Sequence, residues 1–515
     1  YQRRVRGEMK QNIGIDLGTC NSCVAEYKDK ISAALVNNVS KMLTTPSYVK
    51  FGEKLLIGEE AKLNVQPDTI SSFKRLIGRR FSDFEVQEQI KRVPYQIIDQ
   101  QNSPMIKINE KLLSPAEVSG AFLKQLKLQT GFQATDVVLT VPAYFTHQQK
   151  LETEKAGQLA GLNISRLLAE PTAACLTYDS QNKAALNEYI MVVDLGAGTY
   201  DVSVLEKQGD VYQVLACAGN NFYGGDDYTR ALQLFLEQNQ VKMSFLEAEK
   251  LKHELSGGLL QKQFGDKTVK FGDLSKFGQL DSQLEKPILQ TLSDASLLPT
   301  QINKVLLVGG QTKQPSVQRK IEQIMKQKPL TTLNPDLCVA QGASLQAAIL
   351  NGDLQSVLLL DATPFSLGIE TLNGAFAPVL RRNVTLPAQA SQVFTTTEDN
   401  QQEVIIRVYQ GENQLAARNT LLGEFALSLD EKRPKGVPKI KVEFQIDQNG
   451  VVLVKAIDEK TGKEQKIQVK FGKQREEKSE IQCLREELDQ MGIKWNEKWG
   501  VEKLKAVLKK QRRRQ

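Results

Sequence analysis

Hydrophobic positions follow two different patterns along this chain, and the change occurs near residue 357. Before that point, short apolar runs alternate with segments whose apolar residues recur at helical spacing. Runs of this length predict buried strands, here at 13–17, 136–141, 189–193 and 305–308. Helical spacing and turn residues predict helices at 115–128, 146–160, from 170 onward, 249–256, 314–325 and 336–350. Such alternation of strands and helices indicates an α/β core.

From 357 to about 471 the chain instead shows strands in which apolar and polar residues alternate. Examples are 404–409, 442–446 and 451–454, the last two joined by a turn at 447–450. Alternating strands separated by turn residues predict an all-β module. The last segment, 472–515, is charged and carries apolar stripes at helical spacing, so we expect a helical tail.

Two glycine-containing turns share one composition. The first follows Asp16 and the second follows Asp194, and each contains glycine and then threonine. Each turn lies between a buried run and a second strand, which predicts a β-hairpin whose N–H groups can bind anionic oxygens. One such turn is more often an ordinary hairpin, but a copy 178 residues away indicates two phosphate-binding hairpins around one cleft. An acid beside each turn suggests bound Mg²⁺.

Composition narrows the classes of partner. The 515 residues are 41% apolar and 25% charged, as in ordinary globular proteins of several domains. No apolar run approaches the ~20 residues of a membrane span. The net charge of +7 arises at the C-terminus, where only basic charges follow residue 502. The rest is nearly neutral, so nucleic-acid binding is not indicated except through this basic tail.

Cysteine and histidine usage bears on compartment and chemistry. The six cysteines form no disulfide framework, which favours the cytoplasm or the mitochondrial matrix over secretion. Cys20 and Cys23 form a CxxC pair without a second pair, so coincidental spacing is favoured over a redox or metal function. His147 and His253 are the only histidines, which excludes a His-rich metal centre. The basic residues at 3–6 are too few to identify a transit peptide.

The glycine turns are neither a Walker A loop nor a GxGxxG turn. Other motifs are more specific: IGIDLGTCNSCVA, FKRLIGRRF, VPAYF, EPTAA, DLGAGTYDVSVLE, LLVGGQT, NPD, VLLLDATPFSLGIET and QVFTTTEDNQ. In this order, over residues 12–471, they resemble the 70-kilodalton heat-shock chaperones of the DnaK type, in their bacterial and mitochondrial branch.

This resemblance implies a multidomain α/β plus β fold. An actin-like (ribonuclease H-like) two-lobed ATPase domain would occupy 11–353 and an apolar interdomain linker 354–362. A β-sandwich substrate-binding domain would follow at 363–471, which we call the β-module. The basic helical tail at 472–515 would be a truncated lid.

The resemblance also implies ATP/ADP and Mg²⁺ as cofactors and assigns roles in the cleft. The catalytic residues would be Lys74, Glu170, Thr199, Asp201 and Asp16. Asp16 and Asp194 would hold Mg²⁺, mostly through water. The nucleotide would be bound by Gly18, Thr19, Cys20, Asn21, Lys74, Gly196, Ala197, Gly198, Thr199, Glu249, Lys252, His253, Ser256, Gly309, Gly310, Gln311, Lys313 and Asp336. For His253, an exposed helix residue without function is an equal alternative, and His147 is expected on the outer surface without a catalytic role.

In the β-module the resemblance implies a groove for an extended peptide, bound through backbone hydrogen bonds and an apolar pocket. The groove residues would be Ile369, Leu372, Phe394, Thr397, Val404 and Ile406. For Ile369 and Phe394, simple core positions are an equal alternative. Pro142, Lys150 and Asp361 match the relay that couples the ATP state to this groove.

Several residues depart from the family pattern. Cys20 replaces a threonine and Ala197 a glycine in the phosphate turns, so hydrolysis is expected to be slow. Lys150 replaces an arginine of the relay and lacks its two-pronged donor group, which puts the coupling in doubt. The segment 227–304 is short, in the lobe where exchange factors bind, and the lid is a stub.

The favoured hypothesis is an ATP-dependent chaperone that binds exposed hydrophobic, extended segments. Its partners would be unfolded clients and a J-domain co-chaperone, with a nucleotide-exchange factor left open. The alternative is a degenerate relative that binds ATP with little or no hydrolysis and acts as a regulator or scaffold. A sugar kinase would have no use for residues 361–471.

Overall fold

The computed structural model describes residues 11–182, 186–257, 261–265, 267–270, 275–355, 357–447 and 450–469. The basic residues at 3–6 and the expected helical tail at 472–515 lie outside these ranges. Within them, every helix falls short of the length and hydrophobicity that a bilayer-spanning segment needs.

The first sheet contains the earlier of the two glycine turns. Its strand order is β12, β11, β1, β2, β3, and β4 also pairs with β2. β1 pairs antiparallel with β2 and parallel with β11. The strands are β1 (Asn12–Asp16), β2 (Asn21–Lys28), β3 (Ile31–Ala34), β4 (Thr44–Pro46), β11 (Asp136–Val141) and β12 (Asn163–Ala169).

The second sheet repeats this local topology around the later glycine turn. Its strand order is β18, β13, β14, β15, β19, and β13 pairs antiparallel with β14 and parallel with β18. Each acid-bearing strand therefore has a hairpin partner on one side and a parallel strand on the other. The strands are β13 (Asn187–Leu195), β14 (Tyr200–Gln208), β15 (Val211–Asn220), β18 (Lys304–Val308) and β19 (Leu358–Leu360).

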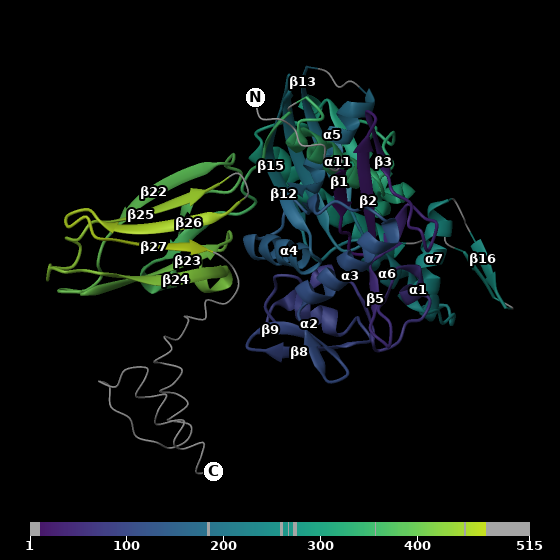
Figure 1. Ribbon diagram of the computed structural model, residues 1–515, viewed down its shortest axis with the longest axis horizontal. Coiled ribbons are helices and arrows are strands. Elements are labelled where there is room, and N and C mark those ends of the chain that lie inside the picture. Colours follow the sequence, from purple (N-terminus) through teal and green to yellow (C-terminus); the bar gives the residue numbers. More distant parts are fainter. Residues whose placement is uncertain are drawn as a thin grey trace, which may run out of the picture. The chain divides into compact units, whose positions relative to one another are not determined.

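Two helices, α5 (Glu170–Asn182) and α11 (Cys338–Asn351), pack against each other between these sheets, and α11 also covers β1 and β2 (Figure 1). Glycine permits this close packing. A Cβ on Gly14 would lie 2.2 Å from the Ser344 nitrogen, and one on Gly342 would lie 1.9 Å from the Ala173 carbonyl oxygen. The two halves are thus joined by tightly packed backbones, which fixes the cleft between them.

The outer layers contain the remaining helices and small sheets of both halves. The helices are α1 (Glu59–Lys62), α2 (Phe84–Ile90), α3 (Pro115–Thr130), α4 (His147–Leu159), α6 (Gly225–Gln238), α7 (Phe245–Ser256), α8 (Ser275–Asp281), α9 (Glu285–Asp294) and α10 (Pro315–Met325). The small sheets are formed by β5 (Tyr48–Lys50), β6 (Leu56–Ile57) and β7 (Thr69–Ser71), by β8 (Gln96–Gln100), β9 (Ser103–Ile108) and β10 (Lys111–Leu113), and by β16 (Gln261–Phe264) and β17 (Lys267–Lys270).

Local sequence explains several helix starts. Ser114, Thr146 and Ser244 each precede a helix and form a capping box with a Glu or Gln three residues later. The side-chain oxygen accepts from the backbone N–H of that residue, whose own side chain accepts from the cap N–H. The strand predicted at 136–141 is confirmed as β11. The helix predicted from 336 is also confirmed, as α11, which begins at Cys338.

The β-module consists of two four-stranded antiparallel sheets. Burial alternates residue by residue along β25 and β26, which places one face of that sheet in the core. One sheet contains β20 (Leu367–Glu370), β21 (Phe376–Leu380), β23 (Glu403–Gln410) and β24 (Thr420–Ser428). The other contains β22 (Ala388–Phe394), β25 (Ile440–Ile446), β26 (Val452–Asp458) and β27 (Glu464–Val469). The expectation of an all-β module is confirmed.

Candidate functional site

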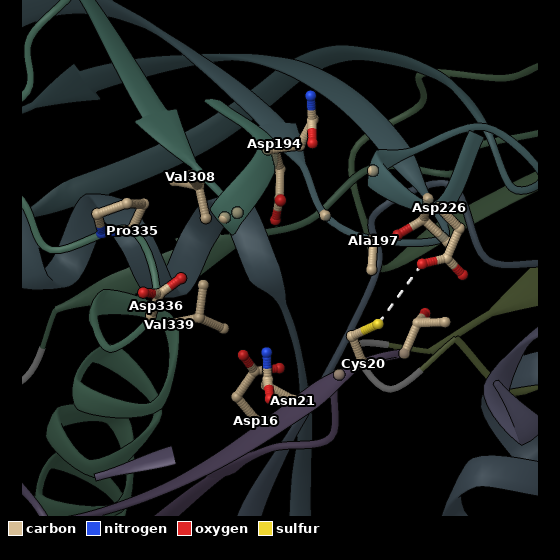
Figure 2. A pocket seen from close by; sticks show the side chains of 18 of the residues that line it. Asp16, Cys20, Asn21, Asp194, Ala197, Asp226, Val308, Pro335, Asp336 and Val339 are labelled. Atoms are coloured by element: carbon tan, nitrogen blue, oxygen red, sulfur yellow. Dashed lines mark hydrogen bonds between the residues drawn. The ribbon is translucent and has the colours of Figure 1, made fainter. Parts of the chain in front are cut away.

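One cavity between the two halves collects most of the residues predicted for the cleft. Asp16 and Asp194 project into it from opposite sides (Figure 2). The predicted residues that line it are Asp16, Gly18, Thr19, Cys20, Asn21, Lys74, Glu170, Asp194, Gly196, Ala197, Thr199, Glu249, Lys252, His253, Gly309, Gly310, Gln311 and Asp336. Gly198, Asp201, Ser256 and Lys313 do not line the cavity but contact residues around it.

The hairpin registers place the acids. Asp194 lies directly opposite Asp201 in the β13–β14 pair, beside the turn at 196–199. In the first sheet, Asp16 is the acid of the other hairpin. Thr140, on the neighbouring parallel strand β11, donates a hydrogen bond to Asp16 at 3.1 Å. Gly309 follows β18 with φ of +80°, and a Cβ there would lie 2.7 Å from Asp194 Oδ1. Only glycine leaves room for the Asp194 carboxylate at this strand end.

Lys74 and Glu170 form a buried ion pair at 2.9 Å. Lys74 belongs to the short 3-10 helix Phe73–Arg75, and Glu170 is the first residue of α5. Burial alone would lower the pKa of Lys74, but Glu170, Asp16 and Asp194 outweigh it and raise the pKa. The lysine therefore remains an ammonium group at the wall of the cavity.

The acids outnumber this cation. Burial, and then the charge of Glu170, raise the pKa of Asp16 to about 7 and that of Asp201 to about 8. The same causes raise the pKa of Asp194. Buried carboxylates in excess beside glycine turns fit a divalent cation with bound phosphates. Within the described residues no group of three or more His, Cys, Asp or Glu side chains has the arrangement of a metal site.

The far end of the cavity is formed by α7 and by the segment after β18. Lys252 Nζ donates to the Gly225 carbonyl at 2.8 Å, and burial lowers its pKa. His253 is exposed on α7 and also lines the cavity, and partial burial, then the charge of Lys252, lower its pKa. Glu249 pairs with Lys62 at 2.7 Å. At this end of the cavity both basic groups, Lys62 and Lys252, are thus held by partners, the Glu249 carboxylate and the Gly225 carbonyl.

Some residues lining the cavity were not predicted: Gly225, Asp226, Val308, Pro335 and Val339. Asp226 accepts a hydrogen bond from Cys20 Sγ at 3.5 Å (Figure 2), and its backbone N–H donates to the Ala197 carbonyl. The Gly-Gly-Asp-Asp run at 224–227 is the signal that could have identified it. Val308 and Val339 have no such signal, because a valine next to a cavity resembles any core valine.

The CxxC pair is separated by the fold. Cys20 faces the cavity, whereas Cys23 is buried in the core with Ala25 and Ala340. All cysteines among the described residues are free thiols. The two thiols of the pair therefore lie in different surroundings.

The predicted groove residues of the β-module differ in exposure. Ile369 and Ile406 are buried, with exposed fractions of 5% and 2%, whereas Leu372 is 65% exposed. Phe394 and Val404 are half-buried and Thr397 is exposed. They come from β20, β22, β23 and the loops between them, so both the core and the groove interpretations remain open for Ile369.

The residues predicted for interdomain coupling do not form one hydrogen-bonded chain. Asp361 accepts from Thr172 Oγ1 at 3.3 Å and lies 3.9 Å from an Arg166 nitrogen. It follows β19, which pairs parallel with β15 at the edge of the second sheet. Pro142 follows β11 and accepts from the Phe145 N–H. Lys150 lines a separate small cavity beneath the β-module.

His147 is not on the outer surface, so that expectation is wrong. Its side chain is 6% exposed, and its backbone N–H donates to Gln410 Oε1 of the β-module at 3.2 Å. Together with Lys150 it lines the small cavity against Phe365 and Ile446. The sequence predicted an exposed start for α4. In the structure, β-module residues that are distant in the chain cover it.

A duplicated hairpin cleft with glycine turns, a buried lysine and excess acids, followed by an all-β module, defines a two-lobed nucleotide-binding protein with an appended β domain. The family model described as Hsp70 protein matches residues 12–499. The "Heat shock 70 kDa protein, mitochondrial" of Pisum sativum is 40% identical over 496 residues, covering 89% of this chain and 73% of that relative. The chain belongs to the Hsp70 family.

Membership establishes the general activity. The protein is an ATP-dependent molecular chaperone and an ATPase, and the degenerate alternative has no support. Its family combines an actin-like ATPase with a β-sandwich domain, uses ATP/ADP and Mg²⁺, and acts on client polypeptides with J-domain co-chaperones. The sheets described above agree with that architecture.

Proposed function

We propose that the cavity binds Mg²⁺ and ATP with the phosphates between the turns at 18–21 and 196–199. One observation supports this proposal most directly. The buried Lys74–Glu170 pair lines the same cavity as Asp16 and Asp194, the acids of the two hairpins. Asp16 and Asp194 hold Mg²⁺ mostly through water, and the bound ion neutralises phosphate charge. The adenosine lies between α7, with Glu249, and the glycines after β18.

Hydrolysis then depends on charge neutralisation and on a positioned water. Lys74 supplies a fixed cation at the γ-phosphate. Glu170, Thr199 and Asp201 orient the attacking water. Asp201 Oδ1 accepts from the Tyr144 N–H at 3.1 Å, while its buried Oδ2 has no hydrogen-bond partner among the described residues. A buried acceptor without a partner is unfavourable, which supports a role in binding that water.

The domain assignment is part of the same proposal. Residues 11–353 form the ATPase, 354–362 the linker and 363–471 the substrate-binding domain. The apolar residues proposed for the groove bind extended clients, and Pro142, Lys150 and Asp361 couple that groove to ATP. The short segment at 227–304 weakens binding of an exchange factor. The name of the pea relative, which is mitochondrial, supports the mitochondrial matrix rather than the cytoplasm as the compartment of this protein.

The substitution Thr199→Ala tests the proposed cleft. It removes the hydroxyl that orients water but no N–H of the turn, so ATP affinity should stay within about tenfold while single-turnover hydrolysis falls ~100-fold. Both quantities are measured by rapid filtration of radiolabelled ATP. Thr130→Ala, at the end of α3, is the matched control and should change neither. Unchanged hydrolysis in Thr199→Ala would show that Thr199 does not position the water.

A further inference from the structure

Arg75 is buried beneath the second phosphate turn, although it belongs to the other half of the cleft. Its side chain follows Lys74 in the 3-10 helix and is 3% exposed. Nη2 donates to the Ala197 carbonyl at 3.2 Å and lies 3.5 Å from Asp227 Oδ2. Arg75 therefore joins the lysine segment to the turn at 196–199 and to the start of α6.

The turn fits tightly against this guanidinium. A Cβ on Gly198 would lie 2.7 Å from Arg75 Nε and 2.7 Å from Thr19 Cγ2. Gly198 is thus held between Thr19 of the first turn and Arg75. The Nε atom is buried and has no hydrogen-bond partner among the described residues. Only a glycine therefore fits at position 198, beside the Arg75 guanidinium.

A second arginine shares the surroundings of Arg75 but not its contact with the turn. Both guanidinium groups contact the Phe222 ring, whose centroid lies 4.8 Å from the guanidinium carbon of Arg75 and 4.6 Å from that of Arg92. Arg92 also pairs with Asp227, at 2.8 Å. The two side chains therefore share a ring and a carboxylate, while the Ala197 carbonyl accepts only from Arg75 of the two. The chain thus supplies its own control for the role of Arg75.

We infer that Arg75 is a positioning residue for ATP hydrolysis, which fixes the turn at 196–199 relative to Lys74. This inference rests on the proposed function of that turn. In the proposed function, Lys74 and Thr199 act on the same reacting atoms from opposite halves of the cleft, so hydrolysis depends on their spacing. Arg75 is adjacent to Lys74 in the chain and bonded to the turn that carries Thr199. A displacement of about 1 Å at such a site can cost ~100-fold in rate.

The test compares Arg75→Lys with Arg92→Lys in the full chain. Lysine keeps the positive charge, but its side chain is one atom shorter and lacks the planar guanidinium whose Nη2 contacts both the Ala197 carbonyl and the Asp227 carboxylate. For Arg75→Lys we expect ATP affinity within about threefold of wild type and single-turnover hydrolysis slowed ~10-fold or more. For Arg92→Lys both should stay within about twofold, since it does not contact the turn. Arg75→Gln, which retains an N–H donor, replaces Arg75→Lys if thermal unfolding shows that the lysine variant does not fold.

The outcomes separate this inference from the proposal on which it rests. If Arg75 only holds the halves together, its substitution would weaken ATP binding and leave the rate per bound ATP unchanged, which would overturn the inference. Equal slowing by Arg92→Lys would also overturn it, because the effect would then belong to Phe222 and Asp227. Thr199→Ala is measured in the same series. Normal hydrolysis there contradicts the proposed cleft, whereas slow hydrolysis there with a normal Arg75→Lys contradicts the role of Arg75 alone.

Discussion

Each of the two functional regions contains a buried ion pair, and the surroundings of the two pairs differ. In the cleft, Lys74 and Glu170 lie at a cavity with further acids whose pKa values are raised. In the β-module, Arg433 donates to Asp458, which is fully buried. Burial would raise the pKa of Asp458, but hydrogen bonds from Arg433 and the Lys460 N–H outweigh it and lower the pKa.

This difference separates a chemical role from a structural one. Both pairs are removed from water, so burial of charge does not by itself identify a site. The Arg433–Asp458 pair is complete, because the carboxylate receives enough donors to stay ionised. In the cleft, Lys74 pairs with Glu170, and the neighbouring acids Asp16 and Asp201 have raised pKa values. Removing one partner should therefore affect catalysis in the cleft and stability in the β-module.

The largest effect is expected for Lys74→Ala. Loss of the fixed cation at the γ-phosphate should slow single-turnover hydrolysis ~1,000-fold. Lys74→Ala leaves Glu170 buried and unpaired, which could destabilise the protein. The double variant Lys74→Ala/Glu170→Gln is therefore measured beside it, to separate an effect on the hydrolysis rate from an effect on folding. Lys155→Ala, on the exposed face of α4, is the control. A rate within tenfold of wild type in the folded variants would remove Lys74 from the mechanism.

Next comes Asp458→Ala in the β-module. It leaves Arg433 buried without its partner, so the module should lose about 3–5 kcal/mol of unfolding free energy, while basal ATP hydrolysis stays near wild type. Calorimetry of the full chain measures the first quantity and a turnover assay the second.

Asp430→Ala is the matched control, since Asp430 pairs with Lys463 at 2.5 Å in an exposed position. Its removal should cost at most about 1 kcal/mol. An equally small cost for Asp458→Ala would show that the buried pair does not stabilise the module.

A smaller effect is expected for Val404→Phe. Val404 is half-buried on β23, and a phenyl group there should fill the proposed pocket and weaken binding of a fluorescent extended peptide ~10-fold. Val393→Phe, on the exposed part of β22, is the control and should leave affinity unchanged. Wild-type affinity in Val404→Phe would contradict the groove assignment.

Local features of the sequence predicted local structure well. The strand at 136–141 is an uninterrupted apolar run ended by Pro142, and β11 has those bounds. The helix near 115 has a Ser-Pro start and a glycine end, and α3 shows both signals as a capping box and a left-handed Gly131. The repeated turns were recognisable because acid, glycine and threonine rarely recur in one order by chance.

Long-range packing was beyond the sequence pattern. Lys74 and Glu170 are 96 residues apart, and only the family resemblance suggested that they act together. His147 was misplaced because its burial depends on Gln410 and the β-module, 263 residues away. Apolar groove positions such as Ile369 stay ambiguous, since a groove and a core both need apolar side chains.

The central claim is that this cleft hydrolyses ATP and that the β-module responds to it. Single-turnover hydrolysis should be measured in the full chain, alone, with an extended hydrophobic peptide, and with peptide and a J-domain protein together. Our account predicts slow but measurable turnover alone and faster turnover with each addition. ATP that stays bound without forming ADP under all three conditions would contradict it.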